Sequence, residues 1–297
     1  MTRERLFFLD TDIGPDCDDA AALAILLHLC KSGAGRVIGI THCTGSLYGL
    51  AAIDAICRRF RVSVPTGTCN VRGFLSEGPA LRYTPVIAAR CAHGFPPDGP
   101  QPDCADALRQ ALSGVPDGSV TMIAIGPMIN LARYLREEPA LMRAKIGRIV
   151  CMAGAFEADA AFTEWNVEMD IPSARYVAGH WKGPLDFCPF EALADVLTGA
   201  CLAGRPEHPV AIAYREYTDG AMLRPSWDLG TVAAAVNGPE APFEWSAPGT
   251  IAIDARGRTT FTAHPDGRHR YLRRAGSAGD GARHIEALLE RAINDQP

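Results

Sequence analysis

The sequence predicts an α/β protein with an open, mostly parallel Rossmann-like sheet, helices on both faces, and a small C-terminal hairpin and helix elaboration. Short apolar runs alternate with helix-like stretches through the first half of the chain, as they do in consecutive βαβ units. Near the C-terminus, two β-like runs flank a turn and an amphipathic stretch follows them. Because no internal repeat or low-complexity linker interrupts this pattern, we expect residues 1–297 to form a single domain.

The expected elements follow in chain order. Short apolar or β-branched runs predict strands at 6–10, 36–41, 120–125 and 148–152. Helices are expected at 18–30, 50–60, 129–136, 192–197, 229–236 and 281–294, whereas 211–218 is ambiguous. The runs 250–254 and 259–264 form a predicted hairpin at the sheet edge, around the turn 255–257. The Gly/Pro-rich stretches 94–102 and 238–248 are expected to be loops.

The first predicted helix, 18–30, is apolar nearly all round, which is typical of a buried helix. Its two acids stand at the N-terminal end, where the helix dipole stabilises negative charge.

Composition excludes several classes of partner. The net charge is −5, so the chain has no general attraction for nucleic acid or for an anionic membrane. No apolar run approaches the roughly 18 residues of a membrane helix, and the apolar block near the N-terminus is too short for a signal peptide. The ten cysteines show no Cys-x-x-Cys spacing and are expected to be reduced thiols. We therefore expect a cytoplasmic protein whose partner is a small molecule.

Five carboxylates gather between the first strand and the first helix. The segment DTDIGPDCDD contains Asp10, Asp12, Asp16, Asp18 and Asp19, and in an open α/β sheet this turn is where ligands bind. A solvated acidic loop with one helix-capping residue would account for one acid but not for five. Hard oxygen ligands this close together fit calcium or magnesium better than zinc, so the pattern predicts a metal site.

Four segments carry a resemblance to a known family. FLDTDIGPDCDDAAALAILL resembles the N-terminal signature of the nucleoside hydrolases, the calcium-dependent N-ribohydrolases called inosine/uridine-preferring. The segments GPMINL at 126–131, EWN at 164–166 followed by Asp170 and Pro172, and SWD at 226–228 resemble later family motifs in the same order. The resemblance covers about residues 6–236.

The resemblance implies a set of site residues and an activity. It implies a Ca²⁺ ion held by carboxylates and one backbone carbonyl, from Asp12, Asp19, Asp228 and Ile129. Asp18 would hold the ribose hydroxyls, and Glu164 and Asn166 would make further sugar contacts. The implied reaction is hydrolysis of the N-glycosidic bond of ribonucleosides to ribose and free base, using a calcium-bound water activated by Asp12. Family members serve nucleoside salvage and are commonly homodimers or homotetramers.

The chain departs from the family pattern where the base would leave. Trp227 stands where many members have a histidine general acid, and an indole has no titratable proton to give, so it either stacks on the base or packs. His93, in Ala-His-Gly, resembles a family active-site position and is the expected leaving-group acid. Tyr214, Arg215 and Tyr217 are further candidates near the base.

Two sugar-binding positions also differ from the family. Ser46 and Ala158 stand where asparagines are usual, and Ser46 is expected to contact substrate.

Two other functions are considered beside hydrolysis. One is a non-catalytic, calcium-dependent nucleoside- or ribose-binding homologue, which the departures at Trp227, Ser46 and Ala158 keep open. The other is a haloacid-dehalogenase-like phosphatase, which also begins with Asp-x-Asp after a strand. That class needs a downstream lysine, and neither Lys145 nor Lys182 lies in a suitable context.

Overall fold

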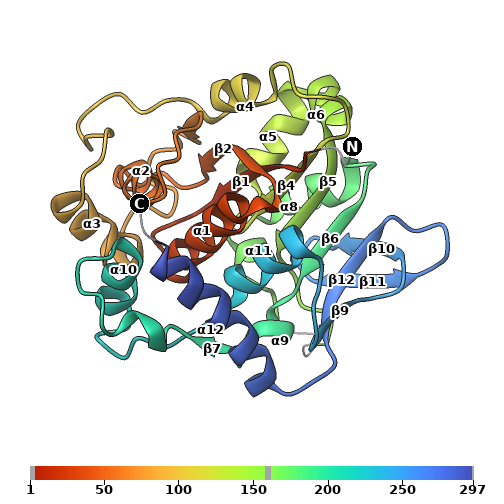
Figure 1. Cartoon of the computed structure of the whole chain (residues 1–297). Helices are drawn as coiled ribbons and strands as arrows, with labels where there is room; N and C mark the ends of the chain where they lie inside the picture. The colour runs from red at the N-terminus through yellow and green to blue at the C-terminus, as the bar shows by residue number, and fades with distance from the viewer. Residues whose placement is uncertain (1–3, 158–161, 296–297) are drawn as a thin grey trace.

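A computed structural model describes residues 4–157 and 162–295 and shows a central sheet covered by helices (Figure 1). The strands are β1 (Leu6–Thr11), β2 (Arg36–His42), β3 (Thr66–Thr68), β4 (Val120–Ala124), β5 (Ile146–Met152), β6 (Leu185–Cys188), β7 (Leu197–Thr198), β8 (Arg224–Pro225), β9 (Phe243–Trp245), β10 (Gly249–Ile253), β11 (Thr259–Ala263) and β12 (His269–Arg274). The helices are α1 (Asp18–Leu29), α2 (Gly49–Arg59), α3 (Thr84–Arg90), α4 (Cys104–Leu112), α5 (Ile129–Glu137), α6 (Pro139–Lys145), α7 (Trp165–Met169), α8 (Ile171–His180), α9 (Phe190–Leu193), α10 (Pro209–Tyr217), α11 (Trp227–Asn237) and α12 (Ala278–Asn294). Short helical turns cover Cys30–Ala34, Gly78–Leu81 and Ala200–Leu202.

The parallel part of the sheet has the strand order β3-β2-β1-β4-β5-β6, which is the order of a Rossmann-like doubly wound sheet. The direction of winding reverses between β1 and β4, and ligands of such sheets bind outside the carboxyl ends of the strands at that point. β12 continues the sheet parallel to β6, and the antiparallel pair β10–β11 closes that edge. The predicted fold class and the predicted edge hairpin are confirmed.

Helices cover both faces of the sheet. On one face, α1 packs against α2, α10, α11 and α12, as Figure 1 shows. Because neighbours surround it, nearly every residue of α1 is buried, as its apolar sequence predicts. On the other face, α4, α5, α6 and α8 form a second layer, with a separate apolar core.

Local patterns misplaced some elements. The predicted helix 192–197 is wrong in its second half: α9 ends at Leu193, and Leu197–Thr198 pairs with β8 instead. This pairing joins segments far apart in sequence, so no local periodicity could show it. The ambiguous stretch 211–218 lies in and just after α10, which begins with Pro209 at its first position. The predicted loop 238–248 contains the short strand β9.

The cysteines and the helices agree with what the composition predicts. All ten cysteines are free, and most are buried among apolar side chains, as expected of thiols acting as small hydrophobes. Within residues 4–157 and 162–295, no helix is long and apolar enough to cross a bilayer.

The packing between β2 and α4 leaves no room for a side chain at Gly39. A Cβ there would lie 2.6 Å from the Phe8 ring and 2.8 Å from Ala111 Cβ. We predict that Gly39→Ala destabilises the protein by about 1–3 kcal/mol, the usual cost of overpacking a core, as measured by urea unfolding. The matched control is Gly204→Ala, because no atom lies within 4 Å of a Cβ at that position. Equal stability of the two variants would contradict this account.

Candidate active site

A cavity of about 340 Å³ lies where the winding of the sheet reverses. The segment after β1, the carboxyl ends of β4 and β5, and the beginnings of α7, α9 and α11 contribute to its lining. Part of the loop before α3 and single residues of α10 and β8 complete the wall. The site therefore has the location that the fold predicts for a ligand, and its volume suits a small molecule.

Four buried carboxylates form one side of this site. Asp12 follows β1, Asp18 and Asp19 open α1, and Asp228 lies in the first turn of α11. Each is less than 5% exposed. Carboxylate oxygens of Asp18, Asp19 and Asp228 lie within 4.8 Å of one another. The backbone N–H of Asp228 donates to Asp18 Oδ2 at 3.0 Å, which joins the starts of α11 and α1.

These carboxylates are costly to keep charged without a cation. Burial raises the pKa of Asp12, Asp18, Asp19 and Asp228 well above the usual value, and the negative charges of neighbouring carboxylates raise it further. A bound cation would remove both penalties, and every donor in the group is a hard oxygen. The residues present therefore fit a divalent metal ion.

A glycine leaves room for the Asp12 side chain. Its carboxylate lies against Gly126, where a Cβ would stand 2.6 Å from Asp12 Oδ1. Gly126 lies two residues after the end of β4 at Ala124, so the motif GPMINL places a residue without a side chain beside the acid. Thus two segments that the sequence singled out separately form one site.

The structure brings together six of the predicted site residues on the cavity wall, although they come from distant parts of the chain. These are Asp12, Asp18, Glu164, Asn166, Trp227 and Asp228. Asp19 belongs to the same acidic group, through its contacts with Asp18 and Asp228.

Glu164 and Asn166 are held rigidly at the start of α7. The Glu164 carboxylate accepts backbone N–H groups of Asn166 at 2.7 Å, and of Val167 and Gly154 at 3.1 Å each. Burial raises the pKa of Glu164 to about 7, although these hydrogen bonds oppose the shift. Asn166 Nδ2 donates to the backbone carbonyl of Met152 at the end of β5. Both side chains are therefore fixed before any ligand binds.

His93 does not lie on the cavity wall. It follows α3, where its Nε2 pairs with the carbonyl of Ala88 at 3.0 Å and its Nδ1 accepts the N–H of Phe95 at 3.3 Å. Both contacts are satisfied by one neutral tautomer with the proton on Nε2. The structure therefore does not place His93 where it could protonate a base bound in the cavity.

Two other predicted site residues, Ser46 and Ile129, also do not line this cavity. Ser46 is buried in the loop after β2 and lines a neighbouring cavity of about 420 Å³. Ile129 is the first residue of α5, next to the end of β4. Ala158 lies outside the described residues.

Another part of the cavity lining is an aromatic wall, formed by Phe190, Tyr217 and Trp227. The rings of Phe190 and Trp227 stack with centroids 5.4 Å apart, and Trp227 Nε1 donates to the carbonyl of Phe190 at 3.1 Å. Trp227 therefore packs and faces the cavity at once. Of the other candidates, Tyr214 is fully buried and Arg215 bonds to Glu216 and to the Pro206 carbonyl.

Sequence reasoning missed Arg224, which lines the cavity between Tyr217 and Trp227. Its guanidinium binds Asp16, a residue 208 positions away in the sequence. No local signal could have revealed this pairing, although Asp16 itself was visible in the acidic cluster.

A polar network supports the acidic group from behind. Asp10 is fully buried and accepts hydrogen bonds from Thr41 Oγ1 at 2.5 Å and from Asn130 Nδ2 at 2.8 Å. Asn130 Nδ2 also donates to the His42 carbonyl, and Cys104 Sγ donates to Asn130 Oδ1. Burial raises the pKa of Asp10 to about 7. These bonds tie α4 and α5 to the ends of β1 and β2.

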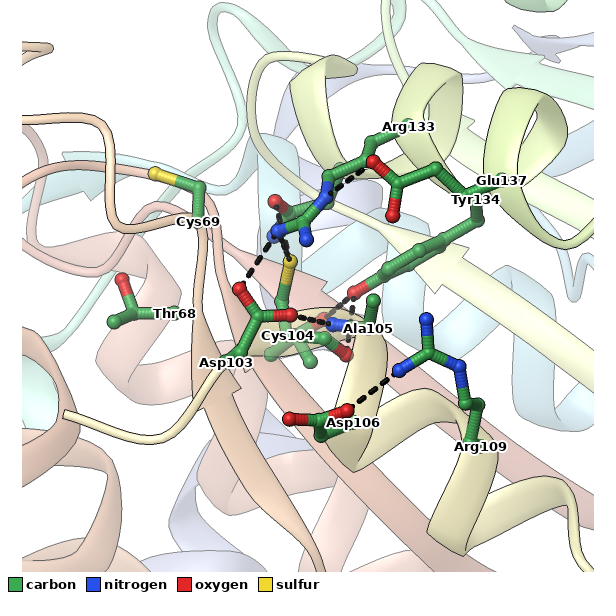
Figure 2. A network of polar contacts seen from close by, with 12 residues as sticks. Thr68, Cys69, Asp103, Cys104, Ala105, Asp106, Arg109, Arg133, Tyr134 and Glu137 are labelled. Atoms are coloured by element: carbon green, nitrogen blue, oxygen red, sulfur yellow. Dashed lines mark hydrogen bonds and ion pairs between the residues drawn. The ribbon is translucent and has the colours of Figure 1, made fainter.

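Figure 2 shows how this network continues outward. Asp103 caps α4 by accepting the N–H of Ala105, and Arg133 of α5 donates to Asp103 Oδ2 at 2.8 Å. The Arg133 side chain also binds Glu137 at 3.0 Å on its own helix. The two helices behind the acids are thus joined by ion pairs and hydrogen bonds.

A comparison with known families bears directly on this site. The family described as inosine-uridine preferring nucleoside hydrolase matches residues 7–275. The chain belongs to this family. The resemblance predicted from the sequence is confirmed, and the phosphatase alternative falls away.

Relatives of this nucleoside hydrolase family member are distant. The pyrimidine-specific ribonucleoside hydrolase RihB of Escherichia coli is 29% identical over 194 residues, which is 59% of this chain and 56% of that protein. A purine-preferring ribonucleoside hydrolase from Gardnerella vaginalis matches with a TM-score of 0.74 at 18% identity, over 97% of this chain and 98% of that one. The type III effector protein XopQ, solved with adenosine diphosphate ribose, matches with a TM-score of 0.72 at 18% identity, over 99% and 95%. These structures share the fold.

The acidic group predicts a metal-dependent stability. Adding Ca²⁺, Mg²⁺ or Mn²⁺ at about 100 times its dissociation constant should stabilise the protein by about 2.7 kcal/mol, measured as a shift in Tm. Asp228→Asn should abolish the shift, yet stabilise the metal-free protein because one repelling buried charge is removed. Asp106→Asn, at an exposed acid, serves as the control and should keep the shift. A full metal response in Asp228→Asn would exclude this residue as a ligand.

Glu164 predicts a pH dependence of stability. Its folded pKa of about 7 lies above the usual 4.5, so the stabilising contribution is complete below pH 4.5 and is lost as the pH rises through 7. Wild type should therefore lose on the order of 3 kcal/mol relative to Glu164→Gln between pH 5 and 8, in urea unfolding with a chelator present. The exposed residue Glu240 supplies the control variant Glu240→Gln, which should track wild type at every pH. A constant difference between wild type and Glu164→Gln would contradict the shift.

Proposed function

We propose that this protein hydrolyses the N-glycosidic bond of ribonucleosides, releasing ribose and the free base. One observation carries the proposal: in a member of the nucleoside hydrolase family, a single cavity is lined by both buried carboxylates and aromatic side chains. The carboxylates suit a cation and the hydroxyls of a sugar, and flat rings suit a nucleobase.

We propose Ca²⁺ as the metal. Calcium takes six to eight oxygen ligands in flexible geometry, which accommodates several carboxylates and a carbonyl. Asp12, Asp19 and Asp228, with the backbone carbonyl of Ile129, would hold the ion, and Asp18 beside them would bind the ribose hydroxyls. When bound, the ion would neutralise the carboxylates and act as a Lewis acid towards water and the ribose diol.

The protein's own groups would then carry the reaction. Asp12 accepts a proton from the attacking water at a carboxylate oxygen. Breaking the bond to the base puts positive charge on the ring oxygen and anomeric carbon of the sugar, as in glycoside hydrolysis. Fixed carboxylates near the sugar stabilise that charge, and Glu164 and Asn166 are already locked in place to bind it. Trp227 offers a surface on which the base can stack.

Three further properties belong to the same proposal. A cytoplasmic location is supported by ten unpaired cysteines, because free thiols persist in reducing compartments. The continuous sheet supports one domain over residues 1–297.

A homodimer or homotetramer is supported by the exposed apolar side chains of Leu47, Val71 and Leu81. Light scattering of the purified protein tests the oligomer directly.

Release of reducing sugar from a panel of purine and pyrimidine nucleosides, with Ca²⁺ and after chelation, tests the reaction. We expect calcium-dependent release of ribose, and a loss of about 10²–10⁴ in kcat for Asp12→Asn with little change in KM. Asp106→Asn is the matched control, because Asp106 is exposed and distant in sequence from every proposed site residue.

Other outcomes of this assay have definite meanings. Full turnover in Asp12→Asn would show that Asp12 is not the base. If no nucleoside is hydrolysed, but nucleoside or ribose raises the Tm only when Ca²⁺ is present, the protein is a binding homologue and not an enzyme.

A further inference from the structure

Arg224 is the only cation among the described residues that line the cavity. Six acids share this lining: Asp12, Asp16, Asp18, Glu77, Glu164 and Asp228. The lining also contains no histidine or lysine within the described residues. A lone arginine in so acidic a cavity therefore needs an explanation.

The guanidinium of Arg224 is held in one orientation. Its Nε lies 3.0 Å from both carboxylate oxygens of Asp16, and its Nη2 donates to Asp16 Oδ2 at 2.5 Å. The Cζ atom lies 5.3 Å from the ring centroids of both Tyr217 and Trp227, so two aromatic faces flank the cation. Two aromatic rings and a bidentate ion pair leave a planar fork little freedom.

One edge of the fork remains available to a ligand. Asp16 engages Nε and Nη2, whereas Nη1 has no hydrogen-bond partner in the part of the chain that the structure describes. Arg224 is about one-third exposed, and it lines the cavity. A donor with a fixed positive charge is therefore presented beside Trp227.

The arrangement of the cavity indicates which part of a nucleoside would meet Arg224. Trp227 directly precedes Asp228, so the aromatic wall begins where the acidic group ends. With the ribose on the acidic group, the base has to lie along the aromatic wall. We propose that Arg224 donates a hydrogen bond from Nη1 to a ring nitrogen or carbonyl oxygen of the departing base and stabilises the negative charge that develops on it. This inference rests on the proposed function.

Cleavage of the N-glycosidic bond conserves atoms and charge without a titratable acid beside the base. The bond between the anomeric carbon and the base nitrogen breaks, and its electron pair leaves with the base. The attacking water gives its hydroxyl to the ribose, and its proton passes through Asp12 to solvent, from which the base is protonated. Arg224 keeps its own protons throughout and lends only charge and a hydrogen bond, as a guanidinium must.

The other polar group on the aromatic wall is less suited to this task. Burial raises the pKa of Tyr217 above its usual value, which makes its hydroxyl a weaker acid. Asp16 is a positioning residue, because it touches Arg224 and fixes the direction of the fork.

The test compares leaving groups. Inosine and uridine need help to expel the base, whereas p-nitrophenyl riboside has an activated leaving group that needs little. In Arg224→Gln we expect kcat/KM to fall about 10²-fold or more on the nucleosides, the usual effect of removing a fixed donor to developing charge. On p-nitrophenyl riboside it should fall less than about threefold, because the nitro-substituted ring delocalises the negative charge of the departing phenolate and a further donor adds little.

Two further variants make the result specific. Arg82→Gln is the matched control, because Arg82 also lies over Tyr217, at 5.6 Å, but pairs with Asp219 and does not line the cavity. It should match wild type on both substrates. Arg224→Lys keeps the charge without the fork and should retain more nucleoside activity than Arg224→Gln. An unchanged metal-induced Tm shift in all three variants shows that the acidic group is intact.

Several results would overturn the inference. Equal losses on nucleosides and p-nitrophenyl riboside would assign Arg224 to sugar binding or to folding. No loss on either would leave it without a role in the reaction. A wild-type preference for nucleoside 5′-monophosphates that Arg224→Gln abolishes would make it a phosphate-binding residue. Failure of the proposed function is distinguishable, because wild type itself would then hydrolyse neither substrate, and the inference would fall with it.

Discussion

The burial of several carboxylates at the carboxyl end of β1 is the constraint around which this protein is organised. Asp12, Asp18, Asp19 and Asp228 lie together and are buried, and burial together with the charges of neighbouring carboxylates raises the pKa of each. Such a group persists only when compensation is built around it. The Asp10–Asn130 network behind it, the Asp228 N–H, and Arg224 at its rim each supply part of that compensation, and a cation would supply the rest.

Those parts of the site that depend on local sequence could be predicted. A strand, a turn and a helix beginning with two acids occupy consecutive residues, so the pattern DTDIGPDCDD was sufficient to place Asp12, Asp18 and Asp19 together. The rule for the carboxyl ends of parallel strands then places them at the ligand site. Asp228 joins them from 210 residues away, and only the family resemblance indicated it.

The remaining features depend on contacts that no local pattern encodes. A motif suggested His93 as an acid, but the imidazole turns to the backbone at the end of α3 and satisfies both nitrogens there. Arg224 is positioned by its ion pair with Asp16, 208 residues away in the sequence. It also lies in the two-residue strand β8, and no periodicity in the sequence reveals the pairing of β8 with β7. Residue Leu197, which was predicted to be helical, takes part in the same pairing, and the observed helix α9 ends at Leu193. The direction of the side chains and the pairing of distant strands were therefore the two features that could not be predicted from the sequence.

The two sides of the cavity are built by different means, and this difference separates their roles. The acidic side rests on β1, α1 and the network to α4 and α5, whereas the aromatic side comes from α9, α10 and β8. Helix α11 contributes to both, through Asp228 and Trp227. The buried Thr198–Ser226 hydrogen bond steadies β7 and β8 independently of the acids. The two sides meet in α11, where Trp227 directly precedes Asp228, and at the Asp16–Arg224 pair. Under the proposed function, substitutions in the aromatic wall would therefore change which base fits while the acids stay in place.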